Sequence, residues 1–275
     1  MTIPPDNGRD RASSHAWLQG IGACGSALAL TILGASMLLR LTTQFALDGH
    51  AISSLPPGIE YATRLLHRLA ASGVALLALC AVTLCWIRRS STAHLARPTA
   101  WIVASTVILA LIGPLTPGYR LSAITVVNVT GGMVLLMTFW WLRESVVTQA
   151  TLRKPVDAFS WAAIFAFVAH VGTGAAASAW QMHAVRWPAF VHLASLVLCL
   201  ILIGVIWLEF RRERLLAPWT AGLASLLAIQ LLVGYLLMWQ DSRPLGLTFL
   251  HAMLSSLLAM ALVSLAVRGS IRFRR

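Results

Sequence analysis

Apolar residues fall into eight runs of about twenty along the chain, separated by short polar stretches. A run of this length crosses roughly 30 Å of hydrocarbon as an α-helix, because each helical residue rises about 1.5 Å. The runs do not alternate polar and apolar residues, as the strands of a membrane β-barrel do. The pattern predicts helices over residues 16–39, 60–87, 98–117, 120–142, 158–180, 187–208, 217–239 and 244–267.

Composition agrees with a chain that lies almost wholly within a membrane. Of 275 residues, 58% are hydrophobic and 11% are charged, and the mean hydropathy is +0.78. A soluble domain of this length needs more charge to cover its surface. Helix is the expected form, because backbone groups in lipid must be satisfied within their own segment. The sequence therefore predicts an all-α polytopic membrane protein.

The predicted inner loop around residues 143–157 divides the chain almost at its centre. We therefore expect two four-helix bundles, residues 1–150 and residues 151–275. Gly113 lies late in the third predicted helix and Gly234 lies late in the seventh, and a polar turn follows each. This correspondence predicts that the two bundles are related by an internal repeat, as is common in membrane proteins.

The net charge of +12 would suggest nucleic acid in a soluble protein, but its distribution indicates membrane topology instead. Fifteen lysines and arginines fall on one predicted side and six on the other, which orients both termini toward the cytoplasm. The larger group is Arg9, Arg11, Arg88, Arg89, Arg97, Arg143, Arg153, Lys154, Arg211, Arg212, Arg214, Arg268, Arg272, Arg274 and Arg275. The smaller group is Arg40, Arg64, Arg68, Arg120, Arg186 and Arg243. We expect a bacterial inner-membrane protein without a nucleic-acid partner.

The cysteines and the amino-terminal run carry no further chemistry. Cys24, Cys80, Cys85 and Cys199 all fall inside predicted helices, so we expect packing roles rather than a disulfide or a metal site. The first run follows a segment of mixed acids and bases without an A-x-A cleavage site, which predicts a retained anchor. Phosphate-loop, dinucleotide and zinc-protease motifs are absent from the sequence.

Three histidines fall in the first turns of even-numbered helices: His67, His192 and His251. His192 and His251 follow their outer loops by about five and seven residues, which places both roughly 8–10 Å below the outer surface. This common depth suits the two axial ligands of one haem, and the alternative is hydrogen bonding within the bundle. His170 lies in a stretch of small residues and is expected to pack or form hydrogen bonds.

A second group of polar residues lies at the predicted outer helix starts. Glu60 and Arg64 are four residues apart and can pair on one helix face. Because arginine binds carboxylates bidentately, outer arginines are candidates for holding haem propionates. The alternative is that they snorkel toward the interface. The candidates are Arg64, Arg120, Arg186 and Arg243.

Five motifs occur in a fixed order along most of the chain. They are Arg40-Leu41-Thr42 after the first helix, EYATRL opening the second, LTPGYRL before the fourth, a WP-x-x-x-H start to the sixth, and His251 opening the eighth. With eight helices in two halves, the chain resembles the haem A synthase family. That resemblance implies an enzyme that oxidises a methyl group of haem O to the formyl group of haem A. It also implies haem b held by His192 and His251, and substrate haem in the amino-terminal half near Glu60.

The amino-terminal half departs from the pattern of the family it resembles. The family reads E-x-x-H-R, whereas Thr63 stands at the histidine position here and His67 follows one turn later. Asn128 stands where the fourth helix of the family carries its histidine, and the first outer loop lacks the cysteine pair of many members. His67 would have to compensate for a displacement of about 5.4 Å. If the chain is an enzyme, Glu60 and His67 are the expected catalytic residues.

Three functional hypotheses follow. The first is a haem A synthase-like oxidoreductase in haem A biosynthesis, with haem O synthase or cytochrome oxidase assembly factors as partners. The second is a non-catalytic haem b-binding paralogue that transfers haem or relays electrons. The third is a small-molecule transporter built on the repeat. Gly131 and Gly132 could pack within a chain or between chains, which leaves a homo-oligomer open.

Overall fold

The computed structural model describes residues 8–47, 56–115, 123–148, 158–180, 187–214, 216–239 and 245–269. All regular elements within these ranges are helices. Eight helical segments among them are long and apolar enough to span a membrane. The predicted all-α polytopic fold is therefore confirmed.

Helix α1 extends eight residues beyond its predicted run at each end, and most other helix bounds follow the apolar runs to within a few residues. In chain order the elements are α1 (Gly8–Leu47), α2 (Pro57–Ile87), α3 (Arg89–Thr92), the 3-10 turn η1 (Ala93–Leu95), α4 (Ala96–Ile112), the 3-10 turn η2 (Gly113–Leu115), α5 (Ala123–Val147), α6 (Ala158–Trp180), α7 (Trp187–Phe210), α8 (Ala217–Met238) and α9 (Leu245–Gly269). The third span begins earlier than predicted, at Arg89, because α3 and η1 continue into α4. Because α3 and η1 contain polar residues, the hydropathy pattern alone does not indicate that this segment is helical.

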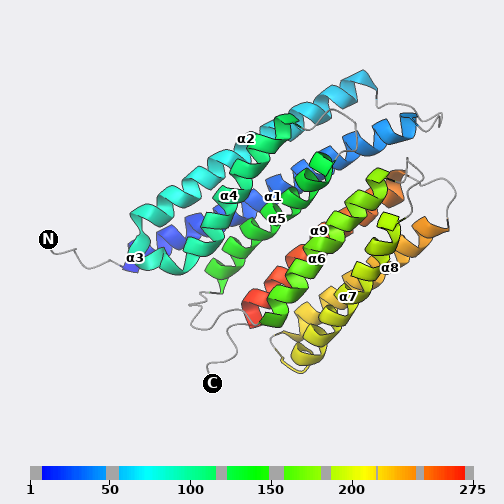
Figure 1. Cartoon of the computed structure of the whole chain (residues 1–275). Coiled ribbons are helices and arrows are strands. Elements are labelled where there is room, and N and C mark those ends of the chain that lie inside the picture. Colours follow the sequence, from blue (N-terminus) through cyan, green and yellow to red (C-terminus); the bar gives the residue numbers. More distant parts are fainter. Residues whose placement is uncertain are drawn as a thin grey trace.

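Two groups of four long helices lie side by side (Figure 1). Helices α1, α2, α4 and α5 form the first group, and α6 to α9 form the second. Helix α1 begins and α9 ends at the same end of the molecule, which we call the terminal face; the opposite end is the distal face. With eight candidate spans, the start of α1 and the end of α9 lie on the same side of the membrane. The excess of arginines predicts that this side faces the cytoplasm.

Helices α5 and α9 form the seam between the two groups and are the most extensively buried. Their inner faces contact each other and the flanking helices α1 and α6. One hydrophobic core runs through this seam from α1 to α9, and a second fills the first group around Phe139. Helices α2, α7 and α8 instead expose many leucines and valines, as lipid-facing helices do.

A buried carboxylate joins the two groups near the terminal face. Glu144 of α5 is fully buried and accepts hydrogen bonds from Arg143 at 2.5 Å and from Arg268 of α9 at 2.7 and 2.8 Å. The Arg268 guanidinium lies 4.2 Å from the ring centroid of Trp219 in α8. Trp140 donates to Ser264 across the same seam at 2.7 Å. These contacts tie α5 to α9 where the two groups meet.

Glu144→Gln should destabilise the protein strongly, because two arginines would lose their shared counter-charge in a buried site. Breaking a buried ion pair typically costs about 3–5 kcal/mol. Glu60→Gln is the matched control, since its partner Arg64 sits with it at a partly exposed position and such pairs contribute about 1 kcal/mol or less. Thermal unfolding in detergent should show a large drop for Glu144→Gln only. Equal drops would contradict a special role for the seam carboxylate.

Candidate cofactor site in the carboxyl-terminal half

The second group of helices consists of two hairpins that place His192 and His251 at nearly the same depth. His192 lies five residues after the start of α7, and His251 lies six residues after the start of α9. At about 1.5 Å per residue, the two rings lie roughly 8 and 9 Å inward from the distal ends of their helices. The helix starts agree with those predicted from the sequence, and the depth below the membrane surface stays a prediction.

In the first hairpin, the imidazole of His192 rests against a glycine of α6. A Cβ atom at Gly174 would lie 2.8 Å from Cε1 of His192, so the ring occupies the space that a side chain would take. Nδ1 of His192 lies 3.2 Å from the carbonyl oxygen of His170 and 3.3 Å from Oγ1 of Thr173. Because a carbonyl oxygen only accepts, Nδ1 carries the proton and Nε2 keeps a free lone pair.

His170 packs directly on His192. The two rings stack with centroids 4.1 Å apart and planes inclined by 9°. Nδ1 of His170 lies 2.9 Å from Oγ of Ser195, and that hydroxyl donates to the carbonyl oxygen of His192 at 2.8 Å. The expected packing and hydrogen-bonding role of His170 is confirmed. Its neighbour is the candidate ligand itself, which sequence spacing alone did not indicate.

The second hairpin repeats this arrangement with glutamine in place of the stacked histidine. A Cβ atom at Gly234 of α8 would lie 3.3 Å from Cε1 of His251. The Gln230 amide nitrogen lies 3.3 Å from Nε2 of His251 and donates to Oγ of Ser255 at 2.8 Å. Nδ1 of His251 is buried, forms no hydrogen bond of normal geometry with the described residues, and lies beside the backbone of Gln230.

The two hairpins are therefore structurally equivalent around their imidazoles. His170 and Gln230 each precede the seating glycine by four residues, so they lie one turn away on the same helix face. Ser195 and Ser255 follow the two imidazole-bearing residues by three and four positions. Gly113 of the first group, which the sequence pairs with Gly234, has no described atom within 4 Å of an added Cβ. The glycine seat for an imidazole is thus a feature of the second group.

His192 and His251 are the residues of this site that could hold a haem iron. Among the described residues, no group of three or more histidine, cysteine, aspartate or glutamate side chains could hold a metal ion. A haem iron needs only two axial ligands from the protein, and neutral imidazole is a common one. The hydrogen bond from Nδ1 of His192 to a carbonyl oxygen is the outer-shell contact that orients a ligating imidazole.

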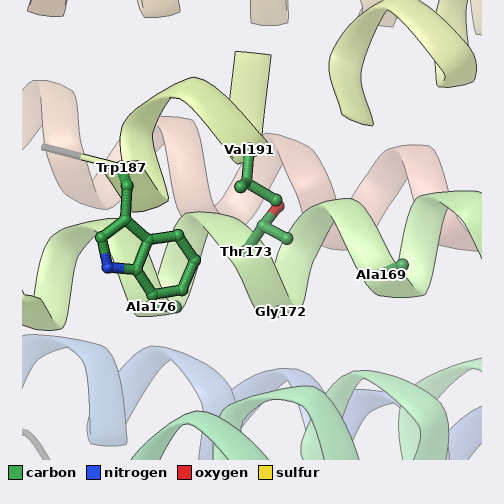
Figure 2. A pocket seen from close by; sticks show the side chains of 6 residues that line it. All are labelled: Ala169, Gly172, Thr173, Ala176, Trp187 and Val191. Atoms are coloured by element: carbon green, nitrogen blue, oxygen red, sulfur yellow. The ribbon is translucent and has the colours of Figure 1, made fainter. Parts of the chain in front are cut away.

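A shallow apolar hollow of about 240 Å³ lies between α6 and α7 next to this site (Figure 2). Thr173 and Val191 point toward each other across it, and the indole of Trp187 lies over α6. Ala169, Gly172 and Ala176 complete the lining. Because Thr173 also contacts His192, the hollow ends beside the candidate ligand. The surface of its lining is almost wholly apolar.

The candidate residues of the first group are only partly brought together. Glu60 accepts two hydrogen bonds from Arg64, at 2.8 and 3.0 Å, so the predicted pair is present. His67 lies on the same face of α2, half-buried, and makes no hydrogen bond with any described residue. The buried Thr63 donates its hydroxyl to the carbonyl oxygen of Ile59 at 2.8 Å. Its hydroxyl is thus engaged by its own helix.

Three of the predicted arginines, Arg120, Arg186 and Arg243, lie outside the described residues. Their assignment to haem propionates stays a prediction.

Gly174→Ala should displace His192, because the new methyl would approach Cε1 to 2.8 Å. Overpacking of this kind costs about 1–3 kcal/mol, and Gly234→Ala should cost less because its contact is 3.3 Å. Gly204→Ala and Gly222→Ala are controls on α7 and α8, since nothing lies within 4 Å of either position. Thermal unfolding should show the controls unchanged or stabilised. A Gly174→Ala protein as stable as the controls would contradict the close packing of the His192 imidazole against Gly174.

No protein-family model matches the chain, and a search of curated proteins finds no significant match. The function therefore has to be inferred from the residues of the site.

Proposed function

We propose that the protein is a haem A synthase-like membrane oxidoreductase that holds one haem b between His192 and His251. The observation that supports this proposal is the equivalent seating of the two imidazoles. They lie on neighbouring hairpins at nearly the same depth, each against a glycine of the preceding helix. Two unrelated structural histidines would not require the same glycine seat in both hairpins.

The neighbouring side chains favour imidazoles that act as ligands. Nδ1 of His192 donates to a backbone carbonyl oxygen, which leaves Nε2 as the basic atom of the ring. In the second hairpin, Nε2 of His251 has only a long 3.3 Å contact with the Gln230 amide nitrogen. Coordination of Nε2 to the haem iron would replace this contact. When bound, haem b supplies the redox couple of the reaction. The protein orients the rings and surrounds them with apolar helices that exclude water.

The first group of helices would receive the substrate haem near the distal face. Glu60 and Arg64 form an ion pair there, and His67 follows on the same face of α2. Arg64, with Arg120, Arg186 and Arg243, would bind propionate carboxylates. The proposed reaction would convert the methyl group of haem O to the formyl group of haem A, a four-electron oxidation in which water or dioxygen supplies the oxygen atom and an external electron acceptor takes up the electrons. This assignment implies a bacterial inner membrane, cytoplasmic termini, and haem O synthase or oxidase assembly factors as partners.

Thr63 supports a second candidate, a non-catalytic haem b carrier. Thr63 occupies the position of the expected first-half histidine, and its hydroxyl is bonded within α2. Asn128 stands at the other expected histidine position. A half without imidazole at these positions could leave the protein with haem b alone, for haem transfer or electron relay. The two candidates share the site at His192 and His251 and differ in the first group of helices.

Removing either proposed ligand should abolish haem b binding. His192→Ala and His251→Ala, purified from haem-supplied cells, should each lose the reduced b-type absorption at least roughly tenfold. His94→Ala is the control, because His94 lies near the terminal face and contacts His15 rather than the site. Wild-type absorption in both variants would rule out these ligands. A colourless wild-type protein would instead favour the transporter hypothesis.

Co-expression with haem O synthase should separate the two haem-binding candidates. If the protein is an oxidoreductase, haem extracted from the cells should contain haem A. Glu60→Gln and His67→Ala should then lower the haem A yield while the b-type absorption of the purified protein persists. If wild-type protein carries haem b and no haem A forms, the carrier is supported and the enzyme is contradicted.

A further inference from the structure

Arg40 is a largely buried cation to which no described residue supplies a counter-charge. It lies near the distal end of the membrane-spanning part of α1, Ser13–Thr42. Its Nε and Nη1 atoms are buried and have no hydrogen-bond partner among the described residues. Its Nη2 atom contacts only the thioether sulfur of Met37, which is a weak acceptor. One N–H on Nε and two on Nη1 are therefore left without an acceptor.

This situation is unusual for an arginine in a membrane. Arginine stays protonated in proteins, and a buried charge is costly unless an opposite charge accompanies it. Long side chains near a helix end normally extend to the interface, whereas this guanidinium is held within the protein. By contrast, the described cations Arg64, Arg143 and Arg268 each bond a glutamate.

The packing around α1 places Arg40 at the seam between the two helix groups. Leu33 of α1 packs on Gly132 of α5, and Gly34 lies against Phe249 of α9. Arg40 follows Leu33 by seven residues, which returns it to the same helix face about 10 Å closer to the distal end. Arg40 thus lies on the face of α1 that packs on α5, about 10 Å further toward the distal face than Leu33.

We propose that this seam is a binding site for an anionic oxygen ligand, a carboxylate or a phosphate, held by Arg40. Such a ligand supplies both the missing negative charge and acceptors for the free N–H groups. Two sources carry this chemistry at the distal membrane surface: the phosphate of a phospholipid and the propionate of a porphyrin. The site does not require the haem b site at His192 and His251, so each can fail without the other.

The phospholipid arm uses protein freed of lipid in a neutral maltoside detergent. Adding phosphatidylglycerol should raise the unfolding temperature of the wild-type protein, because a ligand that binds the folded state stabilises it. Arg40→Met should abolish this rise. In the absence of lipid, Arg40→Met should be at least as stable as wild type, because it removes an uncompensated buried charge. This second expectation separates loss of a ligand from failure to fold.

The porphyrin arm compares haem with its dimethyl ester, which lacks free carboxylates. If a propionate is the ligand, wild-type protein should bind haem more tightly than the ester, and Arg40→Gln should remove this preference. The expected loss is about ten- to hundredfold in Kd, the usual range for a hydrogen bond to a charged group. Arg40→Lys should lose less, because it keeps the charge. The exposed Arg68→Gln is the matched control and should leave both ligands unaffected.

Two results would overturn the proposal. In the first, Arg40→Gln and Arg40→Met respond to both ligands as wild type does. In the second, Asp48→Asn or Asp241→Asn reproduces the effect of Arg40→Gln, and combining that substitution with Arg40→Gln causes no further loss of ligand response. That result would mean that a carboxylate of the chain itself neutralises Arg40. Ligand dependence in one arm only would assign the site to phosphate or to propionate.

Discussion

A polar side chain within a membrane-spanning helix must find its partner on its own helix or on a neighbour, because lipid offers none. Most such groups here use the first solution. Ser26, Thr31 and Thr106 donate to the carbonyl oxygen four residues earlier, so their hydroxyl groups are satisfied within their own helices. Fewer groups bridge helices, and these mark the places where the architecture is specific: the Glu144 cluster at the seam and the imidazole sites of the second group. Nε and Nη1 of Arg40 and Nδ1 of His251 are buried without a hydrogen-bond partner among the described residues.

The two groups of helices solve this constraint differently. The first group fills its centre with Phe139, Leu142 and other buried side chains, and its polar pairs lie near the ends of the helices. The second group places histidine, serine, threonine and glutamine side chains between the two helices of each hairpin. The two groups have similar hydropathy patterns, but they differ in the polar side chains that they place between their helices. This asymmetry agrees with one haem b in the second group and an altered site in the first.

Hydropathy was sufficient to predict the spans, because helix length and backbone satisfaction leave few alternatives in a bilayer. The positions of His192 and His251 relative to the starts of their helices also followed from counting residues. The partners across helices did not: Glu144 and Arg268 are 124 residues apart, and local periodicity carries no information about such a pair. His170 could have been recognised, because His170–Gly174 and Gln230–Gly234 repeat a polar residue followed four positions later by glycine. The short α3 escaped prediction because its polar sequence interrupts the apolar pattern.

The central claim is that the second group of helices holds haem b between two imidazoles. The most direct measurement is the haem content of wild-type protein purified from haem-replete cells, combined with the electron paramagnetic resonance spectrum of its oxidised form. The account predicts one haem b per chain with the low-spin spectrum of two imidazole ligands. A colourless protein, or a bound haem with a high-spin spectrum, would contradict it.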